Sequence, residues 1–255
     1  MLKDYKNHVQ ERLQQGIPPL ALNAEQVSDL VDLLKSPPKG EEDYILDLIT
    51  NRTPAGVDPA AYVKAGFLTA IAKGETTSPL IDKEHATTLL GTMLGGYNVE
   101  SLIGLLEDEE VGQIAAEGLS KTLLMFNAKH DVIELAQKNS NAKRVVDSWS
   151  NAEWFTSRPE LPEIIKAIVF RVEGEINTDD LSPAPDAPSR PDIPLHALAM
   201  LKKTMENPIA TIEKLKESGL PVVFVGDVVG TGSSRKSATN SLLWHIGEDL
   251  SLIHI

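Results

Sequence analysis

The sequence predicts a chain of two parts, an all-helical part followed by an α/β part. As far as about residue 160, apolar residues recur with the period of amphipathic helices. After Pro159 the pattern changes to a partial alternation of apolar and polar residues, which is typical of a strand. Near the end, a short apolar run, a glycine-rich loop and a helical pattern follow one another, which is the order of an α/β layer.

The first part is predicted to consist of short helices joined by polar turns. One helix face carries apolar residues at i, i+3, i+4 and i+7: Val27, Leu30, Val31 and Leu34. Further helices are expected over 41–51, after Asp58, after Asp82, from about 98, over 111–126 and, as a pair, over 128–150. Helix pairs that recur about every 35–45 residues favour a helical-repeat array. An irregular helical bundle is the alternative, because the residues themselves do not repeat clearly.

The second part is predicted to combine strands and helices around a proline-rich stretch. A strand is expected over 164–173, and a second, buried strand over 221–225, where the sequence is Pro-Val-Val-Phe-Val. The five prolines from Pro183 to Pro194 exclude a helix and a central strand between them. Helices are predicted over 195–204, 210–218 and 236–246.

Composition excludes several classes of function. The 255 residues include no cysteine, so this chain by itself cannot form a disulfide, a cysteine nucleophile or an iron–sulfur site. Its 37 acidic and 24 basic side chains give a net charge of −13, which argues against non-specific binding to nucleic acids or anionic membranes. Because the first residues are charged and no apolar run could span a bilayer, a cytoplasmic location is expected.

The last six residues, Leu-Ser-Leu-Ile-His-Ile, match the translation of a transposon end used to prepare sequencing libraries. We therefore interpret 250–255 as an adapter-derived addition, with a natural C-terminal strand as the alternative. We expect residues 1–160 to form a helical-repeat domain. If 250–255 derive from an adapter, residues 161–249 form an α/β domain that is truncated at its C-terminus.

Residues 230–235, Gly-Thr-Gly-Ser-Ser-Arg, form the first loop to which chemistry can be assigned. Glycines let a backbone approach a ligand closely, and N–H groups at the start of the following helix attract an anion. Arg235 can bind a carboxylate or phosphate through two parallel hydrogen bonds. The loop matches neither a Walker phosphate loop nor a serine-hydrolase elbow. An ordinary turn between strand and helix is the alternative to an anion site.

Residues 177–191, from Asn-Thr-Asp-Asp-Leu-Ser to Ser-Arg-Pro, form the second such loop. Its paired acids and the proline-held Arg190 can form a polar wall of an active site, although these residues alone favour a solvated surface loop. The six histidines lack the spacing of metal ligands, so no metal site is assigned to this chain.

Together these residues resemble the bacterial aconitase B family over residues 1–249. GDVVGTGSSRKSATNS is similar to the Gly-Ser-Ser-Arg motif of the aconitase swivel domain, and NTDDLSPAPDAPSRPDIPLHALAMLK to its other active-site segment. VDLLKSPPKGEE, VKAGFLTAIAKGE and LLGTMLGGYN resemble the family's N-terminal HEAT-like domain. The resemblance implies a multidomain α plus α/β fold, in which an all-α HEAT-like solenoid precedes an incomplete β/β/α swivel domain.

The resemblance also assigns roles to five residues. Ser233 would be the catalytic base that removes a proton from the substrate as an alkoxide, with Ser234 beside it in the substrate site. Arg190 and Arg235 would bind substrate carboxylates. Asp179 would belong to the polar network of the active site.

The implied enzyme is a hydro-lyase of the tricarboxylic acid cycle that interconverts citrate and isocitrate through cis-aconitate. Dehydration of 2-methylisocitrate is also implied. The family's 4Fe–4S cluster is held by three cysteines in later domains. Because this chain has no cysteine, we expect the cluster only in a full-length parent and expect this chain alone to be inactive.

The implied partners are a tricarboxylate substrate, a second copy of the chain bound through the HEAT-like domain, and a regulatory mRNA, with no membrane. Two alternatives stay open. One is a non-catalytic helical-repeat docking protein with an anion-binding α/β domain. The other is a stand-alone swivel subunit, as in isopropylmalate isomerase, which pairs with a cluster-bearing chain.

Overall fold

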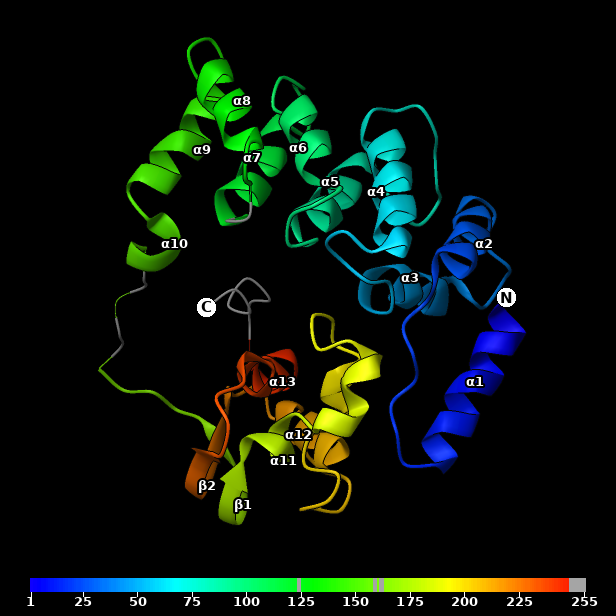
Figure 1. Cartoon of the computed structure of the whole chain (residues 1–255), viewed down its shortest axis with the longest axis vertical. Helices are drawn as coiled ribbons and strands as arrows, with labels where there is room; N and C mark the ends of the chain where they lie inside the picture. Colours follow the sequence, from blue (N-terminus) through cyan, green and yellow to red (C-terminus); the bar gives the residue numbers. More distant parts are fainter. Residues whose placement is uncertain (123–124, 158–159, 161–162, 248–255) are drawn as a thin grey trace. The chain divides into compact units, whose positions relative to one another are not determined.

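The computed structural model describes residues 1–122, 125–157, 160 and 163–247 (Figure 1). These residues form thirteen α-helices, two short 3-10 helices and a two-stranded parallel sheet, an α plus α/β layout. The chain divides into two compact units: Leu22–Glu160, and Met1–Ala21 together with the chain from Leu161 onward. No described helix is long and apolar enough to cross a membrane. The predicted change of pattern at 158–159 and the predicted adapter at 250–255 lie outside the described residues.

The described residues of the unit Leu22–Glu160 form nine helices. They are α2 (Ala24–Lys35), α3 (Glu42–Asn51), α4 (Pro59–Ala72), α5 (Lys83–Gly91), α6 (Val99–Leu105), α7 (Gly112–Lys121), α8 (Ala128–Leu135), α9 (Ser140–Ser150) and α10 (Glu153–Thr156). The series of predicted helices is confirmed, although α7 is shorter than the predicted helix over 111–126. It ends where Thr122 takes an extended conformation with ψ 108°, and 123–124 are not described.

Polar side chains begin several of these helices as the sequence predicts. The Asn23 side chain accepts a hydrogen bond from the Gln26 backbone at 2.9 Å, and the Gln26 side chain accepts one from the Asn23 backbone at 3.0 Å. This capping box pairs two N–H groups that the first turn of α2 cannot satisfy. Asp58 and Asp82 likewise cap α4 and α5.

The helical unit buries apolar side chains from each of the helices α2 to α9. Leu34, Leu68 and Leu90 are fully buried, and each such side chain contributes about 1.5–3 kcal/mol through the hydrophobic effect. Gly91 of α5 faces Gly118 of α7 so closely that a Cβ on Gly118 would lie 2.9 Å from the Gly91 Cα. The two backbones can approach this closely only because neither residue has a side chain.

The other unit contains the sheet. Its elements are α1 (Leu2–Gln14), β1 (Ile168–Asn177), α11 (Thr178–Leu181), η1 (Ala184–Ser189), η2 (His196–Ala199), α12 (Pro208–Lys216), β2 (Val222–Thr231) and α13 (Lys236–Ile246). The chain runs from β1 through α12 to β2, which lies parallel to β1 with Ile168 opposite Val222 and Phe170 opposite Phe224. The buried core of this unit comprises Phe170, Val172, Ile176, Leu181, Met200, Leu201, Ile212, Val222 and Ala238.

Several sequence-based expectations for this unit differ from the structure. The strand predicted over 221–225 forms as part of β2, but it is not buried throughout: Val222 is buried, whereas Val223 and Val225 are exposed. The helix predicted over 195–204 is wrong: only η2 forms, because Met200 is extended with ψ 129° and Leu201 has a positive φ of 59°. The proline-rich stretch contains the short 3-10 helix η1, which starts after Pro183 and so tolerates prolines that a longer helix would not. Helix α1 was not predicted, since its stripe of apolar residues is short.

Lys64 is a buried cation in α4 whose described polar contact is the Thr50 carbonyl, at 3.4 Å. Only 3% of the residue is exposed. Burial lowers the pKa of its ammonium from 10.5 to about 8, a difference equivalent to roughly 3 kcal/mol. Below pH 8 both folded and unfolded chains carry the charge, so the folded chain bears the full cost of burying it. Between pH 8 and 10.5 only the unfolded chain keeps the proton, so stability rises with pH.

We therefore expect Lys64→Met to stabilise the helical unit by about 1–3 kcal/mol at pH 7 and to abolish this alkaline rise in stability. Amide hydrogen exchange in α3 and α4 at pH 7 and pH 9 measures both effects. Lys73→Met, which removes an exposed cation at the end of the same helix, is the control and should change stability by less than about 0.5 kcal/mol. Destabilisation by Lys64→Met would contradict the assigned cost.

Candidate functional site

Parallel pairing brings the two loops with predicted chemistry to the same end of the sheet. The loop over 177–191 follows β1, which ends at Asn177, and the loop over 230–235 lies at the end of β2, where Thr231 is opposite Asn177. The carboxyl ends of parallel strands are where ligands bind in α/β sheets. Two segments about fifty residues apart in the sequence therefore meet because their strands run in the same direction.

A capping box shapes the loop after β1. The Asn177 side chain accepts hydrogen bonds from the backbones of Asp179 and Asp180, at 2.8 and 3.0 Å. The Asp180 carboxylate accepts one from the Asn177 backbone at 2.9 Å. This exchange starts α11 immediately after the strand. It fixes Asp179 in the first turn, with 57% of its side chain exposed.

The end of β2 and the loop after it contain two glycines with positive φ, Gly230 at 86° and Gly232 at 89°. Glycine adopts this region without the steric cost that a side chain would add. The Thr178 hydroxyl donates a hydrogen bond to the Ser233 carbonyl at 2.8 Å, which joins the two loops directly.

An ion pair between Asp179 and Arg235 crosses from one loop to the other. Nη1 of Arg235 donates to Oδ1 of Asp179 and to the Ser182 carbonyl, the latter at 3.2 Å. The hydrogen bond from Arg235 holds the pKa of the Asp179 carboxyl below its ordinary value, and a weaker backbone contact from Ala184 acts in the same direction.

Several donors at this site remain available to a ligand. Among the described residues, Nε and Nη2 of Arg235 donate no hydrogen bond, although its side chain is only 27% exposed. In the same part of the chain, the exposed side chains of Ser233 and Ser234 make no hydrogen bond. The free face of the guanidinium, two hydroxyls and the start of α13 thus form a group suited to binding a carboxylate.

Arg190 is engaged elsewhere. Its Nε and Nη2 donate to the two carboxylate oxygens of Asp192, at 2.8 and 2.7 Å. Its φ of 72° lies in the left-handed region, at the end of η1. Of the five predicted site residues, Asp179 and Arg235 are in direct contact, and Ser233 is joined to the same loop through Thr178, with Ser234 between Ser233 and Arg235 in the sequence. They leave Arg190 in a separate pair.

A buried polar cluster behind this site was missed from the sequence. It consists of Ser182, Asp186, Ser189, His196 and Ser237. No local pattern predicts it, because its members are up to 55 positions apart and their types are common in loops. The capping box could have been found, since Asn177 and Asp180 have the required spacing.

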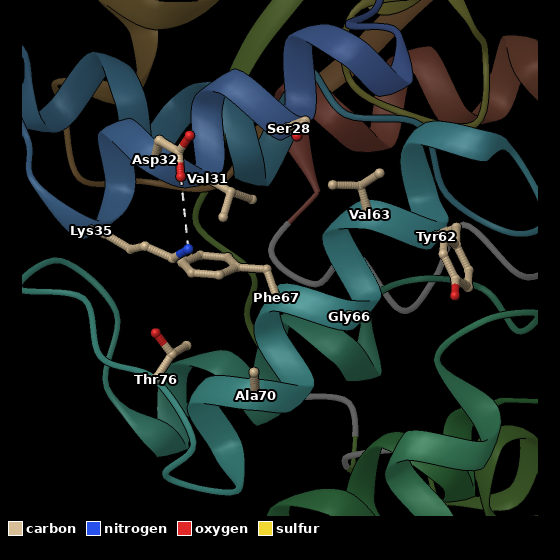
Figure 2. A pocket seen from close by; sticks show the side chains of 10 residues that line it. All are labelled: Ser28, Val31, Asp32, Lys35, Tyr62, Val63, Gly66, Phe67, Ala70 and Thr76. Carbon is tan, nitrogen blue, oxygen red and sulfur yellow. Dashed lines mark ion pairs between the residues drawn. The ribbon is translucent and has the colours of Figure 1, made fainter.

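No metal site is found in the described part of the chain, where no three His, Cys, Asp or Glu side chains converge. A pocket of about 470 Å³ lies in the helical unit, and none of the predicted site residues lines it (Figure 2). Val31 of α2 and Val63 of α4 point into the space between these helices, and the pair Asp32–Lys35 lies at its rim with 3.7 Å between Nζ and Oδ1.

The ion pair between Asp179 and Arg235 should affect the titration of the Asp179 carboxyl. The Asp179 carboxyl should titrate below its ordinary pKa of 3.8, and Arg235→Gln should return it toward 3.8, because the variant removes the cation that stabilises the carboxylate. Carboxyl ¹³C shifts followed against pH measure this. Lys236→Gln, which removes a neighbouring cation without this contact, should leave the Asp179 value unchanged. An equal shift in both variants would show that general charge, rather than the pair, sets the pKa.

Comparison with known proteins assigns the chain to a family. Residues 4–155 match the model of the aconitate B N-terminal domain, and residues 167–254 match the aconitate hydratase 2 N-terminus. Aconitate hydratase B of Pseudomonas aeruginosa is 60% identical over 264 residues, 99% of this chain and 30% of that protein. The Escherichia coli protein of the same name is 59% identical, with 98% and 30% covered. The chain thus spans about 30% of the length of these curated relatives, and it belongs to the aconitate B N-terminal domain family.

Proposed function

We propose that this chain is the N-terminal part of an aconitate hydratase, a hydro-lyase that interconverts citrate and isocitrate through cis-aconitate. The observation that carries the proposal is the free donor face of Arg235 beside the unpaired hydroxyls of Ser233 and Ser234. The names of the relatives support the reaction class. The same site would accept 2-methylisocitrate.

Binding is the first task of the site. A tricarboxylate needs fixed cations, and Arg235 offers Nε and Nη2 as a fork that matches one carboxylate. Asp179 holds that fork in place from the opposite loop. Arg190 would bind a second carboxylate by exchanging Asp192 for the substrate, so that cations from two loops orient the substrate before reaction.

Proton removal is the second task. Ser233 would act as an alkoxide that takes a proton from the carbon next to the one bearing the substrate's hydroxyl. A free serine hydroxyl is far too weak an acid for this, so the oxyanion must be stabilised by nearby donors. Arg235, the backbone at the start of α13 and the neighbouring Ser234 hydroxyl supply donors of that kind. The exposed position of Ser233 leaves it accessible to substrate.

The implied 4Fe–4S cluster does not fit the residues of this chain. Such clusters are held by cysteine thiolates, and the chain contains no cysteine. The part of the reaction that this chain carries is substrate binding, orientation and movement of the proton at Ser233.

The unit Leu22–Glu160 corresponds in this proposal to a HEAT-like solenoid, and the unit with the parallel sheet to a swivel domain. The matches over 4–155 and 167–254 support a domain change near residue 160. Formation of a dimer through the helical domain and regulatory mRNA binding belong to the same proposal and rest on the family resemblance.

The chain should bind tricarballylate, a tricarboxylate without the hydroxyl, in a titration calorimeter. Arg235→Gln should weaken binding by about tenfold or more, because it removes charged hydrogen bonds to a carboxylate. Arg171→Gln is the matched control, since Arg171 is an exposed arginine of β1 that pairs with Asp227. Equal losses in the two variants would contradict a specific clamp.

The chain alone should not turn over citrate, because the residues that the resemblance assigns to the cluster lie outside it. Formation of cis-aconitate followed by its absorbance checks this expectation. Steady turnover by the purified 255-residue chain would overturn it.

A further inference from the structure

His196 is a buried titratable group to which the proposed reaction gives no task. Only 2% of the residue is exposed, and it lies in η2, which in the sequence falls between the two loops of the site. Both ring nitrogens have polar neighbours. Nε2 is 2.8 Å from the Ser182 hydroxyl, and Nδ1 is 3.0 Å from the Asp186 carbonyl and 3.1 Å from the Ser189 hydroxyl.

These neighbours define the protonation of the neutral ring. A carbonyl oxygen can only accept, so Nδ1 carries the hydrogen that points toward Asp186. Nε2 is then an acceptor, and it takes the hydrogen of the Ser182 hydroxyl. The Ser237 and Ser182 hydroxyl oxygens lie 2.8 Å apart and share a further hydrogen bond.

Each end of this chain of hydrogen bonds reaches an arginine segment. Ser182 offers its carbonyl to Arg235, and Ser237 lies two residues beyond Arg235 in the first turn of α13. Ser189 immediately precedes Arg190. A single imidazole thus contacts both the segment that carries Arg190 and the residue that fixes Arg235.

The turn that bears His196 is itself held from a second direction. The Ala197 carbonyl accepts a hydrogen bond from Nε2 of His245 at 2.9 Å, in the last turn of α13. The carboxylate of Asp186, which is 3% exposed, pairs with Lys202 at 2.5 Å. η2 is therefore linked to the last turn of α13 directly, through Ala197, and to its first turn by way of Ser182.

We propose that His196 is a positioning residue that, through Ser182 and Ser189, holds the segments of Arg235 and Arg190 in the arrangement needed to bind an anion. The proposal about the anion rests on the proposed function, whereas the proposal about position does not. Loss of the contact to Ser182 should free the Ser182 segment and let Arg235 leave Asp179. If His196 acted through packing alone, the effect of replacing it would not depend on which ring nitrogen the new side chain mimics.

Two amide variants separate these cases. In His196→Asn the amide can replace Nδ1 but does not reach Ser182, whereas in His196→Gln it can replace Nε2 and keep that contact. We expect the Asp179 pKa, measured without ligand, to move toward 3.8 in the Asn variant and to stay low in the Gln variant. Tricarballylate affinity should fall about tenfold in the Asn variant and recover most of this in the Gln variant. The ¹⁵N shifts of the wild-type ring should show a protonated Nδ1 and an unprotonated Nε2.

Equal values for the two variants, or an unprotonated Nδ1, would overturn the proposal. If His196→Asn does not fold, Ser182→Ala removes the same hydroxyl while it keeps the carbonyl, and should shift the Asp179 pKa in the same direction. Ser120→Ala, which removes a buried hydroxyl in the helical unit, is its control. If the wild-type chain does not bind tricarballylate, the proposed function fails, but the ligand-free titration of Asp179 still decides the role of His196.

Discussion

The parallel pairing of β1 with β2 is the constraint on which the candidate site depends. Since both strands run in the same direction, the loop after Asn177 and the loop after Thr231 leave the sheet at one end. An antiparallel pair would put them at opposite ends, and Asp179 could not reach Arg235. The hydrogen bond from Thr178 to the Ser233 carbonyl then fixes the distance between the loops.

The guanidinium of Arg235 is held in place by hydrogen bonds from one of its nitrogens, while its other nitrogens can still bind a ligand. Nη1 of Arg235 is bound by Asp179 and by the Ser182 carbonyl, while the rest of the guanidinium stays available. A partly paired arginine keeps its orientation and loses less freedom when a ligand binds. The buried cluster around His196 supports the same arrangement, because its hydrogen bonds to Ser182 and Ser189 hold the two segments that carry the exposed site residues.

Much of this arrangement could be predicted from the sequence, and the remainder depends on long-range contacts. Periodicity and capping residues such as Asn23 and Asp82 identified the helices α2 to α9 of the helical unit, whereas the short α10 was not predicted. The helix expected over 195–204 failed because packing against α13 favours the short turn at His196, against local propensity. The motif Gly-Ser-Ser-Arg indicated an anion site, but nothing local to Arg190 indicated that Asp192 would bind it. The attachment of residues 1–21 to the unit with the sheet also has no local signal.

The most direct test of the central claim is a crystal structure of the chain grown with tricarballylate. We predict one carboxylate on Nε and Nη2 of Arg235, next to the hydroxyls of Ser233 and Ser234, with the ion pair between Arg235 and Asp179 retained. Tricarballylate bound at another place, or a carboxylate that displaces Asp179 from Arg235, would contradict this claim.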